Sequence, residues 1–382
     1  MFSAFKRMLR EWRGLKAFNA IPRRERRIVF YSEGGGYWTY FEPVFQALRS
    51  EFQEQVLYVT SSEHDPLLRN PPEGLRAFNV GEGSVRTFFF AGLDADVLLM
   101  TMPDLQTFHI RRSVYPVKYV YLHHSLVSTH MVYRPAAFDH FDAILCAGPH
   151  HVHETRAREA QQGLPEKALV PHGYGRLDAI LAEGLRGPRV RAEGEAPNVL
   201  VAPTWGENGL LEQHAVPLVR HLLDAGLNVT VRPHPRTRTL RPEIFDELSA
   251  VFGDNARFSL DEDANARRSL HMADVMVSDW SGAALEYALG LERPVIFIDV
   301  PRKVQNSHYA ELNCEPLEVQ IREQIGVVLR PDELDQVGRL AHGMADTAER
   351  WQAAAGEARK RCVFNLAQSG HAAAVYLHSL LQ

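Results

Sequence analysis

The chain has 382 residues, of which 45% are hydrophobic and 23% charged, an ordinary balance for one large or two smaller globular domains. Its net charge is −5, but residues 1–27 carry nine Lys/Arg and two Glu, a net +7 that leaves −12 on the remainder. This distribution argues against a general nucleic-acid binder. The three distant cysteines fit neither a disulfide framework nor a zinc site, and no apolar run reaches the ~18 residues of a membrane span.

Residues 1–27 form a basic segment that predicts an amphipathic helix. The apolar residues at helical spacing are Phe2, Phe5, Met8, Leu9, Trp12 and Leu15, with Lys and Arg between them. This pattern is typical of a helix on anionic lipid, and the arginines at 23–27 extend the positive charge. The alternative is a helix that packs on the fold and leaves its charges in water. We expect a cytoplasmic protein, peripheral at the inner face of the cell membrane.

From residue 28 the sequence alternates apolar runs with helical or loop segments. The runs are RIVFYS, QVLYVTS, DVLLMT, KYVYLHH and DAILCAG and then, after a polar linker at 186–198, VLVAPTW, NVTVRP, RFSL and DVMVSD. Such alternation indicates parallel sheets. We therefore predict an α/β protein with two doubly wound, Rossmann-like domains, residues 28–190 and 191–382, facing a central cleft.

Polar residues follow several of the predicted strands. The segments are SEGGG (32–36), HHS (123–125), PTW (203–205), RPHP (232–235) and SDWSG (278–282). In doubly wound sheets ligands bind beyond the carboxyl ends of the strands. These strand ends are therefore the candidate functional residues.

The segment SDWSG opens a predicted helix with two small residues, Ser281 and Gly282. A helix N-terminus offers unpaired N–H groups and partial positive charge, which suit phosphate oxygens. Alternatively, Ser281 only caps its helix and Asp279 closes a turn. Glu286, one turn further, is a hydrogen-bond acceptor for a ribose or acceptor hydroxyl, or a solvated surface charge.

Arg232 and His234 alternate along the end of another strand. Arginine offers a forked donor to phosphate, and histidine donates to a phosphate oxygen or a leaving group. The alternative is a turn histidine bonded to backbone. His123 and His124 point to opposite faces of their strand. Together with His130 they do not have the spacing of a zinc site, so we expect no metal.

The segments APTW (202–205), RPHP (232–235) and SDWSGAALEYALGLERPVIFID (278–299) together resemble the CDP-glycerol glycerophosphotransferases that make teichoic acids. HGYGRLD (172–178) and LHHS (122–125) are similar to further segments of that family. The resemblance implies a GT-B fold, with the nucleotide mainly on the second domain, and peripheral attachment to the membrane. The alternative to a teichoic acid is that the product is a capsule or another surface glycan.

The family reaction is attack of an acceptor hydroxyl on the β-phosphorus of CDP-glycerol, with CMP leaving. The resemblance implies His124 as the base, with His123 as the fallback, and a lipid-linked glycan as the acceptor. His234 and Arg232 neutralise or protonate the leaving phosphate, with no cofactor. The implied donor-binding residues are Thr204, Asp279, Ser281, Gly282 and Glu286, and the acceptor-side candidates are His123, Ser125, Arg176 and Gly35.

Two other functions remain open from the sequence. One is a GT-B glycosyltransferase that uses a nucleotide sugar, since the same Ser-Gly helix and Glu286 would hold its nucleotide. The other is an isomerase like the UDP-N-acetylglucosamine 2-epimerases, which would need no acceptor. A panel of CDP- and UDP-linked donors distinguishes the two transferases, and product analysis without an acceptor identifies the epimerase.

Overall fold

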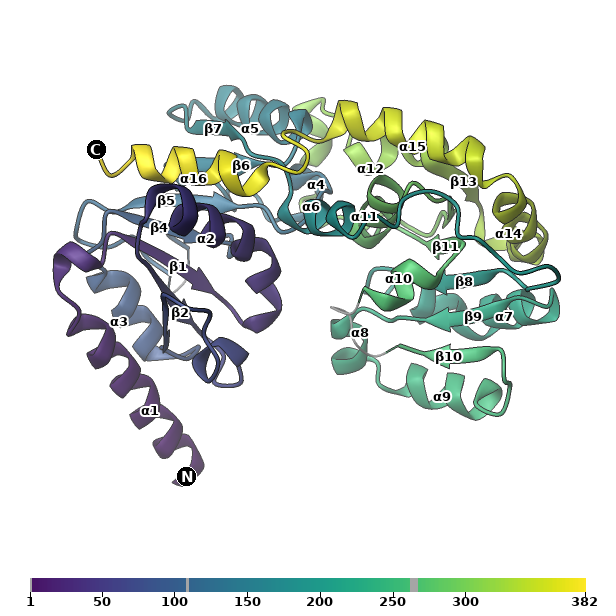
Figure 1. Cartoon of the computed structure of the whole chain (residues 1–382), viewed down its shortest axis with the longest axis horizontal. Helices are drawn as coiled ribbons and strands as arrows, with labels where there is room; N and C mark the ends of the chain where they lie inside the picture. Colours follow the sequence, from purple (N-terminus) through teal and green to yellow (C-terminus); the bar gives the residue numbers. More distant parts are fainter. Residues whose placement is uncertain (1, 108–109, 262–266) are drawn as a thin grey trace. The chain divides into compact units, whose positions relative to one another are not determined.

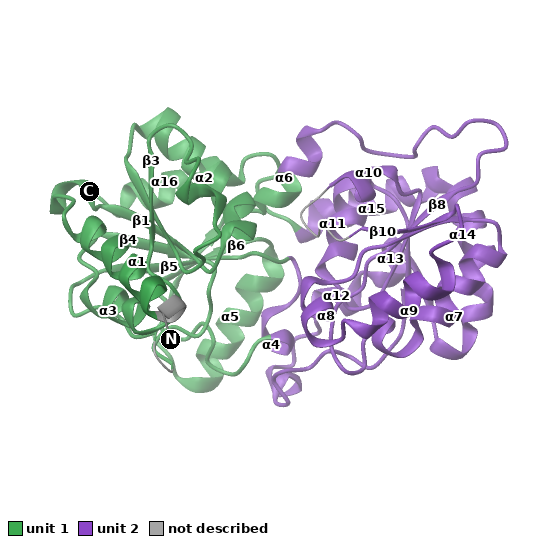
Figure 2. Ribbon diagram, turned by 90° about the horizontal axis from the view of Figure 1, so that it is seen from below, with its two compact units in different colours: residues 1–125, 133–178, 363–382 green, residues 126–132, 179–362 purple. Residues whose placement is uncertain are grey.

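The computed structural model describes residues 2–107, 110–261 and 267–382. The chain forms two compact units, shown in different colours in Figure 2. Unit 1 comprises Met1–Ser125, Tyr133–Asp178 and Val363–Gln382, and unit 2 comprises Leu126–Val132 and Ala179–Cys362. Each unit is built on a parallel sheet with helices, as the alternating sequence predicted.

Unit 1 contains a seven-stranded parallel sheet in the order β3-β2-β1-β4-β5-β6-β7. Its strands are β1 Ile28–Ser32, β2 Val56–Thr60, β3 Leu75–Asn79, β4 Val97–Met100, β5 Lys118–Leu122, β6 Ala143–Cys146 and β7 Ala168–Pro171. Its helices are α1 Phe2–Asn19, α2 Trp38–Phe52, α3 Ser84–Gly92, α5 Pro149–Gln162 and α16 Ser369–Ser379, and α6 Gly175–Ala182 spans the passage to unit 2.

Strands β1, β2, β4 and β6 of unit 1 are buried along their whole length because both faces of the sheet are covered (Figure 1). Ile28 and Phe30 of β1 face a core with α2 and α16. Val29 and Tyr31 face a second core with α1 and α3. Successive side chains of a strand point to opposite faces, so a sheet buried on both sides needs an unbroken apolar run.

Unit 2 contains a six-stranded parallel sheet in the order β10-β9-β8-β11-β12-β13. Its strands are β8 Asn198–Val201, β9 Asn228–Val231, β10 Phe258–Leu260, β11 Val275–Ser278, β12 Val295–Ile298 and β13 Gly326–Leu329. Its helices are α4 Thr129–Val132, α7 Leu210–Asp224, α8 Pro235–Leu240, α9 Glu243–Phe252, α10 Arg268–Met272, α11 Gly282–Leu291, α12 Leu317–Gln320, α13 Arg322–Ile325, α14 Val337–Asp346 and α15 Ala348–Cys362.

The compact units differ from the domain ranges expected from the sequence. The chain passes from unit 1 to unit 2 after Asp178 rather than after residue 190, and residues 363–382 return to unit 1. The return is stabilised by packing, because Ala373, Ala374 and Leu377 of α16 are fully buried in the core with α2. Residues 126–132 also leave unit 1 and belong to unit 2.

Helix α1 is part of unit 1 and not a separate segment. Leu15 and Phe18 are buried in the core with α3, and a Cβ on Gly14 would lie 2.0 Å from the carbonyl oxygen of Asn79. The expectation that Leu15 is available to lipid is therefore wrong. The arginines that follow are also partly engaged, since Arg23 donates to Asp94 and Asp96 at 2.6 Å.

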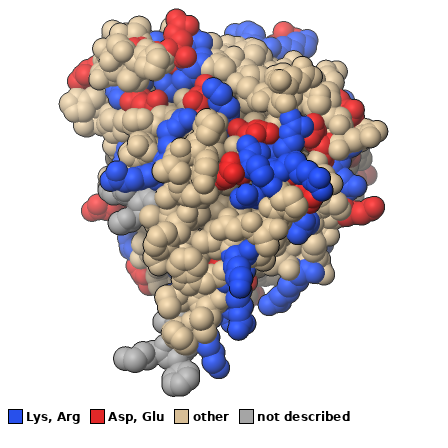
Figure 3. All heavy atoms as spheres, turned by 90° about the vertical axis from the view of Figure 1, so that its left-hand side faces the viewer, with Lys and Arg blue, Asp and Glu red and all other residues tan. Residues whose placement is uncertain are grey.

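Residues 5–10, 12 and 13 of α1 are exposed, in contrast. Phe5 is 54% exposed and Trp12 40%, and the Trp12 ring lies 5.4 Å from the ring of Phe88 on α3, which is 57% exposed. Figure 3 shows Lys and Arg side chains beside uncharged residues on the side of the molecule that lies on the left in Figure 1. Within the described residues, no helix has the length and hydropathy to cross a bilayer.

Candidate functional site

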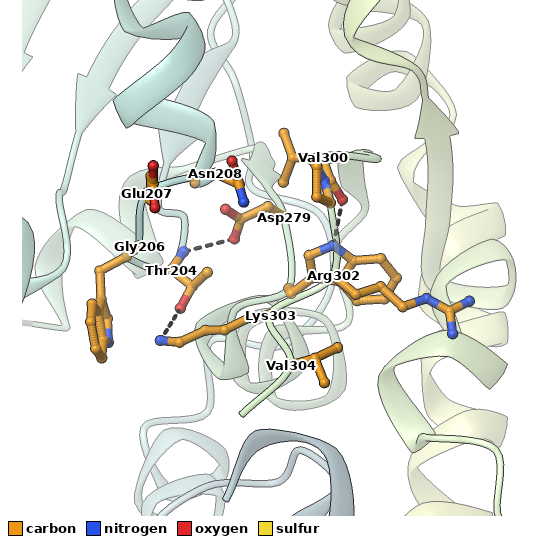
Figure 4. Close-up of a pocket in the computed structure, with 13 residues that line it drawn as sticks. Thr204, Gly206, Glu207, Asn208, Asp279, Val300, Arg302, Lys303 and Val304 are labelled. Atoms are coloured by element: carbon orange, nitrogen blue, oxygen red, sulfur yellow. Dashed lines mark hydrogen bonds between the residues drawn. The ribbon is translucent and has the colours of Figure 1, made fainter. Parts of the chain in front are cut away.

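A polar pocket of about 180 Å³ lies at the carboxyl ends of β8, β11 and β12 in unit 2 (Figure 4). It is lined by residues 204–209, 279–280 and 300–304. Two predicted donor-binding residues, Thr204 and Asp279, are among them. Ligands bind at this end of the strands in doubly wound sheets, so the pocket lies where the sequence placed the functional residues.

Asp279 is buried beneath the loop that follows β8. Its two carboxylate oxygens accept the backbone N–H groups of Thr204, at 2.7 Å, and Leu210, at 3.2 Å. Burial raises the pKa of Asp279 to about 6, although both hydrogen bonds favour the charged form. A strand therefore ends on a carboxylate here because Asp279 fixes the loop that forms one wall of the pocket.

Three basic side chains surround the indole ring of Trp205. The Lys303 ammonium lies 3.7 Å from the ring centroid, the Arg236 guanidinium carbon lies 4.2 Å from it, and the His234 ring centroid lies 6.0 Å from it. Lys303 also donates to the Thr204 hydroxyl at 3.3 Å. An aromatic face attracts cations, so Trp205 helps to hold Lys303 and Arg236 beside the pocket, where their charge can act on an anion.

The charges of this cluster perturb one another. Burial is the main cause that lowers the pKa of Lys303 to about 8; Asp279 opposes this shift and Arg236 adds to it. Burial lowers the pKa of His234 to about 4, with smaller contributions from Lys303 and Arg236. His234 is therefore neutral at pH 7. A phosphate between these groups would offset both the desolvation and the mutual repulsion.

The tautomer of His234 follows from its role as the N-cap of α8. Its Nδ1 accepts the backbone N–H of Arg236 at 3.1 Å. A neutral imidazole carries one proton, so that proton must lie on Nε2. His234 therefore presents a donor at Nε2, which suits a phosphate oxygen or a departing phosphate.

The other predicted donor residues lie outside the lining of this pocket. Ser281 caps α11 by accepting the backbone N–H of Ala283 at 3.3 Å, and Gly282 is the first residue of that helix. Arg232 is 5% exposed and donates to the Ser269 hydroxyl at 3.3 Å, and Glu286 is 6% exposed within α11. Their contact with a donor remains a prediction.

In unit 1, His124 follows β5 and lies among tyrosines. Its Nδ1 is 3.3 Å from the Tyr121 hydroxyl and its Nε2 is 3.4 Å from the Tyr133 hydroxyl. The rings of Tyr37 and Tyr40 pack edge-on at 5.4 and 6.1 Å. Burial lowers the pKa of His124 to about 4, so the imidazole is neutral at pH 7 and has a lone pair that can accept a proton.

His123 occupies different surroundings from His124, as their alternation along the strand predicted. It is 3% exposed, and its ring stacks on His151 at 3.7 Å with an interplanar angle of 16°. Burial, then His151 and three other histidines, hold its pKa well below the usual value. This environment makes His123 a packed core residue.

The remaining acceptor-side candidates have these positions. Ser125 is the last residue of unit 1 before the chain enters unit 2, and Arg176 is 7% exposed in α6. Gly35 packs against the chain, because a Cβ there would lie 2.5 Å from Cδ of Pro66. Close packing thus accounts for Gly35, and the binding roles of Ser125 and Arg176 remain predictions.

Sequence reasoning missed several residues of these two sites, chiefly Arg236, Lys303, Tyr133 and the role of Trp205. Arg236 follows the RPHP segment by one position, and Lys303 lies five residues after β12. A search for basic residues just beyond strand ends would have found both. Among the described residues, no cluster of His, Cys, Asp and Glu has the arrangement of a metal site.

Comparison with protein families gives one match over most of the chain. The family model described as CDP-Glycerol:Poly(glycerophosphate) glycerophosphotransferase matches residues 20–304. No curated protein matches the sequence significantly.

Solved structures similar to the chain share its fold. A structure of the wall teichoic acid polymerase TagF, soaked with CDPG, has 13% identity and a TM-score of 0.57, covering 100% of this chain and 98% of that one. Staphylococcus aureus MnaA with UDP has 14% identity and a TM-score of 0.59, covering 90% and 94%. A putative UDP-N-acetylglucosamine 2-epimerase from Listeria monocytogenes has 14% identity and a TM-score of 0.58, covering 91% and 93%. The predicted GT-B fold is thereby confirmed.

Proposed function

The chain belongs to the CDP-glycerol:poly(glycerophosphate) glycerophosphotransferase family, and from this premise we propose that it transfers glycerol phosphate, or a related alditol phosphate, from a CDP-linked donor to a glycan hydroxyl. The acceptor oxygen attacks the β-phosphorus of the donor, the bond from that phosphorus to the bridging oxygen breaks, and CMP leaves. The acceptor is a lipid-linked or surface glycan.

The observation that carries the proposal is the group of basic side chains around Trp205. A transferring phosphoryl group needs positive charge on its oxygens more than covalent help from the enzyme. Lys303 and Arg236 supply that charge, and the Nε2–H of neutral His234 supplies a hydrogen bond to the departing CMP phosphate. In this reaction Ser281, Gly282 and the N-terminus of α11 hold the rest of the diphosphate, Arg232 adds a donor, and Glu286 contacts the donor's hydroxyl groups.

His124 is the proposed general base. It is neutral at pH 7, and it lies at the carboxyl end of β5, where acceptor groups bind in such a sheet. The acceptor hydroxyl gives its proton to the imidazole as the new phosphorus–oxygen bond forms. With a pKa of about 4 the imidazole is a weak base at pH 7, so this role requires its pKa to rise when the acceptor binds.

Two variants of His234 test the donor chemistry. The protein is incubated with CDP-glycerol, CDP-ribitol and UDP-N-acetylglucosamine, with and without a lipid-linked glycan, and CMP or UDP release is measured. His234→Ala removes both the Nε2 donor and the N-cap, whereas His234→Asn keeps a capping side chain and removes only the Nε2 donor. We expect both folded variants to lose CMP release.

The outcomes of this assay separate the competing functions. Wild-type release of CMP by a folded His234→Asn variant would refute the role of His234. Release of UDP with the acceptor present would favour the nucleotide-sugar glycosyltransferase, and conversion of the UDP-sugar without any acceptor would favour the epimerase.

A second pair of variants tests the base. His124→Ala should lower turnover by roughly 10²–10⁴-fold, the range for a lost general base, while donor affinity changes little. His123→Ala tests the neighbouring residue, and its measured stability must be compared because His123 is buried. Loss of turnover in His123→Ala, with normal turnover in His124→Ala, would move the base by one residue.

We also propose that α1 attaches the protein to an anionic membrane surface. The apolar patch comprises Phe5, Met8, Leu9 and Trp12 of α1 and Phe88 of α3, all between 39% and 57% exposed. The exposed basic residues Lys6, Arg7, Arg10, Arg13 and Lys16 flank it. Apolar side chains at the acyl boundary and cations at the headgroups are the two contributions that interfacial helices use. This attachment would bring the enzyme to a lipid-linked acceptor.

A further inference from the structure

The loop after β12 has two parts with different contacts. Residues 300–304 line the donor pocket, and Lys303 contributes its ammonium group there. The next two residues bind a distant part of the chain instead. The backbone N–H of Gln305 donates to the carbonyl of Met131 at 3.0 Å, and that of Asn306 does so at 3.3 Å.

The Asn306 side chain strengthens this contact. It is 8% exposed, its amide Nδ2 donates to the carbonyl of His130 at 2.9 Å, and its Oδ1 accepts the backbone N–H of His308 at 3.1 Å. Both ends of the amide are thus used, which fixes its orientation. A buried amide with both groups satisfied is a rigid link between two segments.

The segment it holds, residues 126–132, is anchored at two further points. The backbone N–H of Ser128 donates to the Glu318 carboxylate at 2.9 Å, and the Ser128 hydroxyl accepts the N–H of Leu317 at 2.6 Å. The His130 ring hydrogen-bonds the carbonyl of Cys314 at 2.8 Å. Residues 126–131 are buried. The segment is therefore firmly part of unit 2.

Both ends of the same segment carry residues of the proposed base site. His124 lies two positions before residue 126, and Tyr133 follows residue 132 directly. These two side chains contact each other in unit 1, with 3.4 Å between the Tyr133 hydroxyl and Nε2 of His124. Only one residue, Ser125, separates His124 from the anchored segment, so movement of the segment is transmitted to the base by the covalent chain.

We infer that Asn306 is a positioning residue for His124: it links the loop that lines the donor pocket to the segment that carries the base, so that donor binding and placement of the base are coupled. A donor phosphate that draws Lys303 into a fixed position also fixes Gln305 and Asn306, and through them residues 126–132. Donor binding would in this way restrict the movement of His124. The inference rests on the proposed roles of the donor pocket and of His124.

The variant that tests this link is Asn306→Asp. Aspartate keeps the acceptor for the His308 N–H but replaces the donor to His130 by an oxygen that faces a carbonyl oxygen. We expect kcat to fall by about tenfold, the effect of one lost buried hydrogen bond, while the donor Kd does not rise, because donor binding no longer has to order residues 126–132. The matched control is Asn228→Asp, which removes a side-chain amide donor to Ala196 and Asn198 elsewhere in unit 2.

Hydrogen exchange measures the coupling independently of turnover. In the wild type, CDP-glycerol should slow amide exchange in residues 203–209, of which 204–209 line the pocket, and also in residues 126–132. In the Asn306→Asp variant, CDP-glycerol should slow amide exchange only in residues 203–209. Asn228→Asp should behave like the wild type.

The other outcomes are equally decisive. If CDP-glycerol protects residues 203–209 but never 126–132, or if Asn306→Asp matches the wild type, the coupling is refuted. If CDP-glycerol protects neither segment and UDP-N-acetylglucosamine protects both, the coupling stands and the proposed donor is wrong. If no compound of the panel protects 203–209, the pocket is not the donor site and the inference fails with it.

Discussion

At the scale of single residues, the surroundings of Lys303 change its charge behaviour. The ammonium is partly withdrawn from water, and its neighbours include Arg236 as well as Asp279. Burial and the neighbouring guanidinium together lower its pKa to about 8, so most of the population is charged at pH 7 but little of it at pH 10. A group in this state gains more from a bound phosphate than a solvated lysine does.

Donor affinity should therefore depend on pH. The charged form is lost as pH rises through about 8, and a diphosphate diester has no ionisation in this range. The donor Kd should accordingly rise above pH 8, with a limiting slope of roughly tenfold per pH unit. Titration calorimetry with CDP-glycerol between pH 7 and pH 9.5 measures the effect.

The controls for this experiment differ only at position 303. Lys303→Arg keeps its charge over the whole range and should give an affinity that does not change with pH. Lys303→Met should bind weakly at every pH. An equal pH dependence in the wild type and in Lys303→Arg would assign the titration to another group.

Among the elements, α1 has two halves with opposite environments. Leu15 and Phe18 hold the C-terminal half in the core of unit 1, so deletion of the whole helix would unfold its surroundings. The N-terminal half exposes the apolar patch. Point substitutions in that half are therefore the appropriate test of membrane attachment.

The combined variant Phe5→Ser, Leu9→Ser, Trp12→Ser should fail to float with vesicles that contain phosphatidylglycerol. These three side chains are 39–54% exposed, so the removal of each forfeits roughly 1 kcal/mol of burial in the acyl boundary. The basic residues alone give binding that salt screens. The control is Val190→Ser, since Val190 is 93% exposed in unit 2. Equal flotation of the triple variant and the wild type would mean that α1 serves only the fold.

At the scale of the whole molecule, the chain enters each unit more than once. Residues 126–132 belong to unit 2 although they lie between two segments of unit 1, and residues 363–382 return to unit 1 from the end of unit 2. Neither unit is thus a continuous stretch of sequence. The strands, by comparison, are separate along the chain: β1–β7 of unit 1 lie within residues 28–171 and β8–β13 of unit 2 within residues 198–329.

A fragment of residues 1–190 should consequently be unstable by itself. It lacks α16, and burial of Leu377 of that helix in the core with α2 contributes about 2 kcal/mol to the free energy of unfolding. In this fragment residues 126–132 also lose their partners. A chain that joins residues 1–178 to 363–382 through a Gly/Ser linker restores α16 and should melt at a higher temperature. Melting of both fragments is measured by near-UV circular dichroism. Cooperative transitions at the same temperature would contradict this expectation.

The sheets were predictable from sequence because strands buried on both faces leave an unbroken apolar run, as in β4 and β11. Strands β3, β7 and β13 were missed, since all three lie at sheet edges and are only partly buried. His234, Asp279 and Thr204 were predicted because they follow strands directly. Lys303 and Asn306 were not predicted, because they lie in an irregular loop, and no periodic pattern of apolar residues indicates where such a loop runs.

The cations around Trp205 also give the protein an optical signal. An excited indole has a larger dipole moment than the ground state, so its emission wavelength responds to charge a few ångströms away. With Lys303 at 3.7 Å and Arg236 at 4.2 Å from its ring, Trp205 emits in a strong local field that a bound anion would partly cancel. The chain has four other tryptophans, and the difference between the wild type and Trp205→Phe isolates this one, so that occupancy of the pocket can be followed by fluorescence in real time without a labelled substrate.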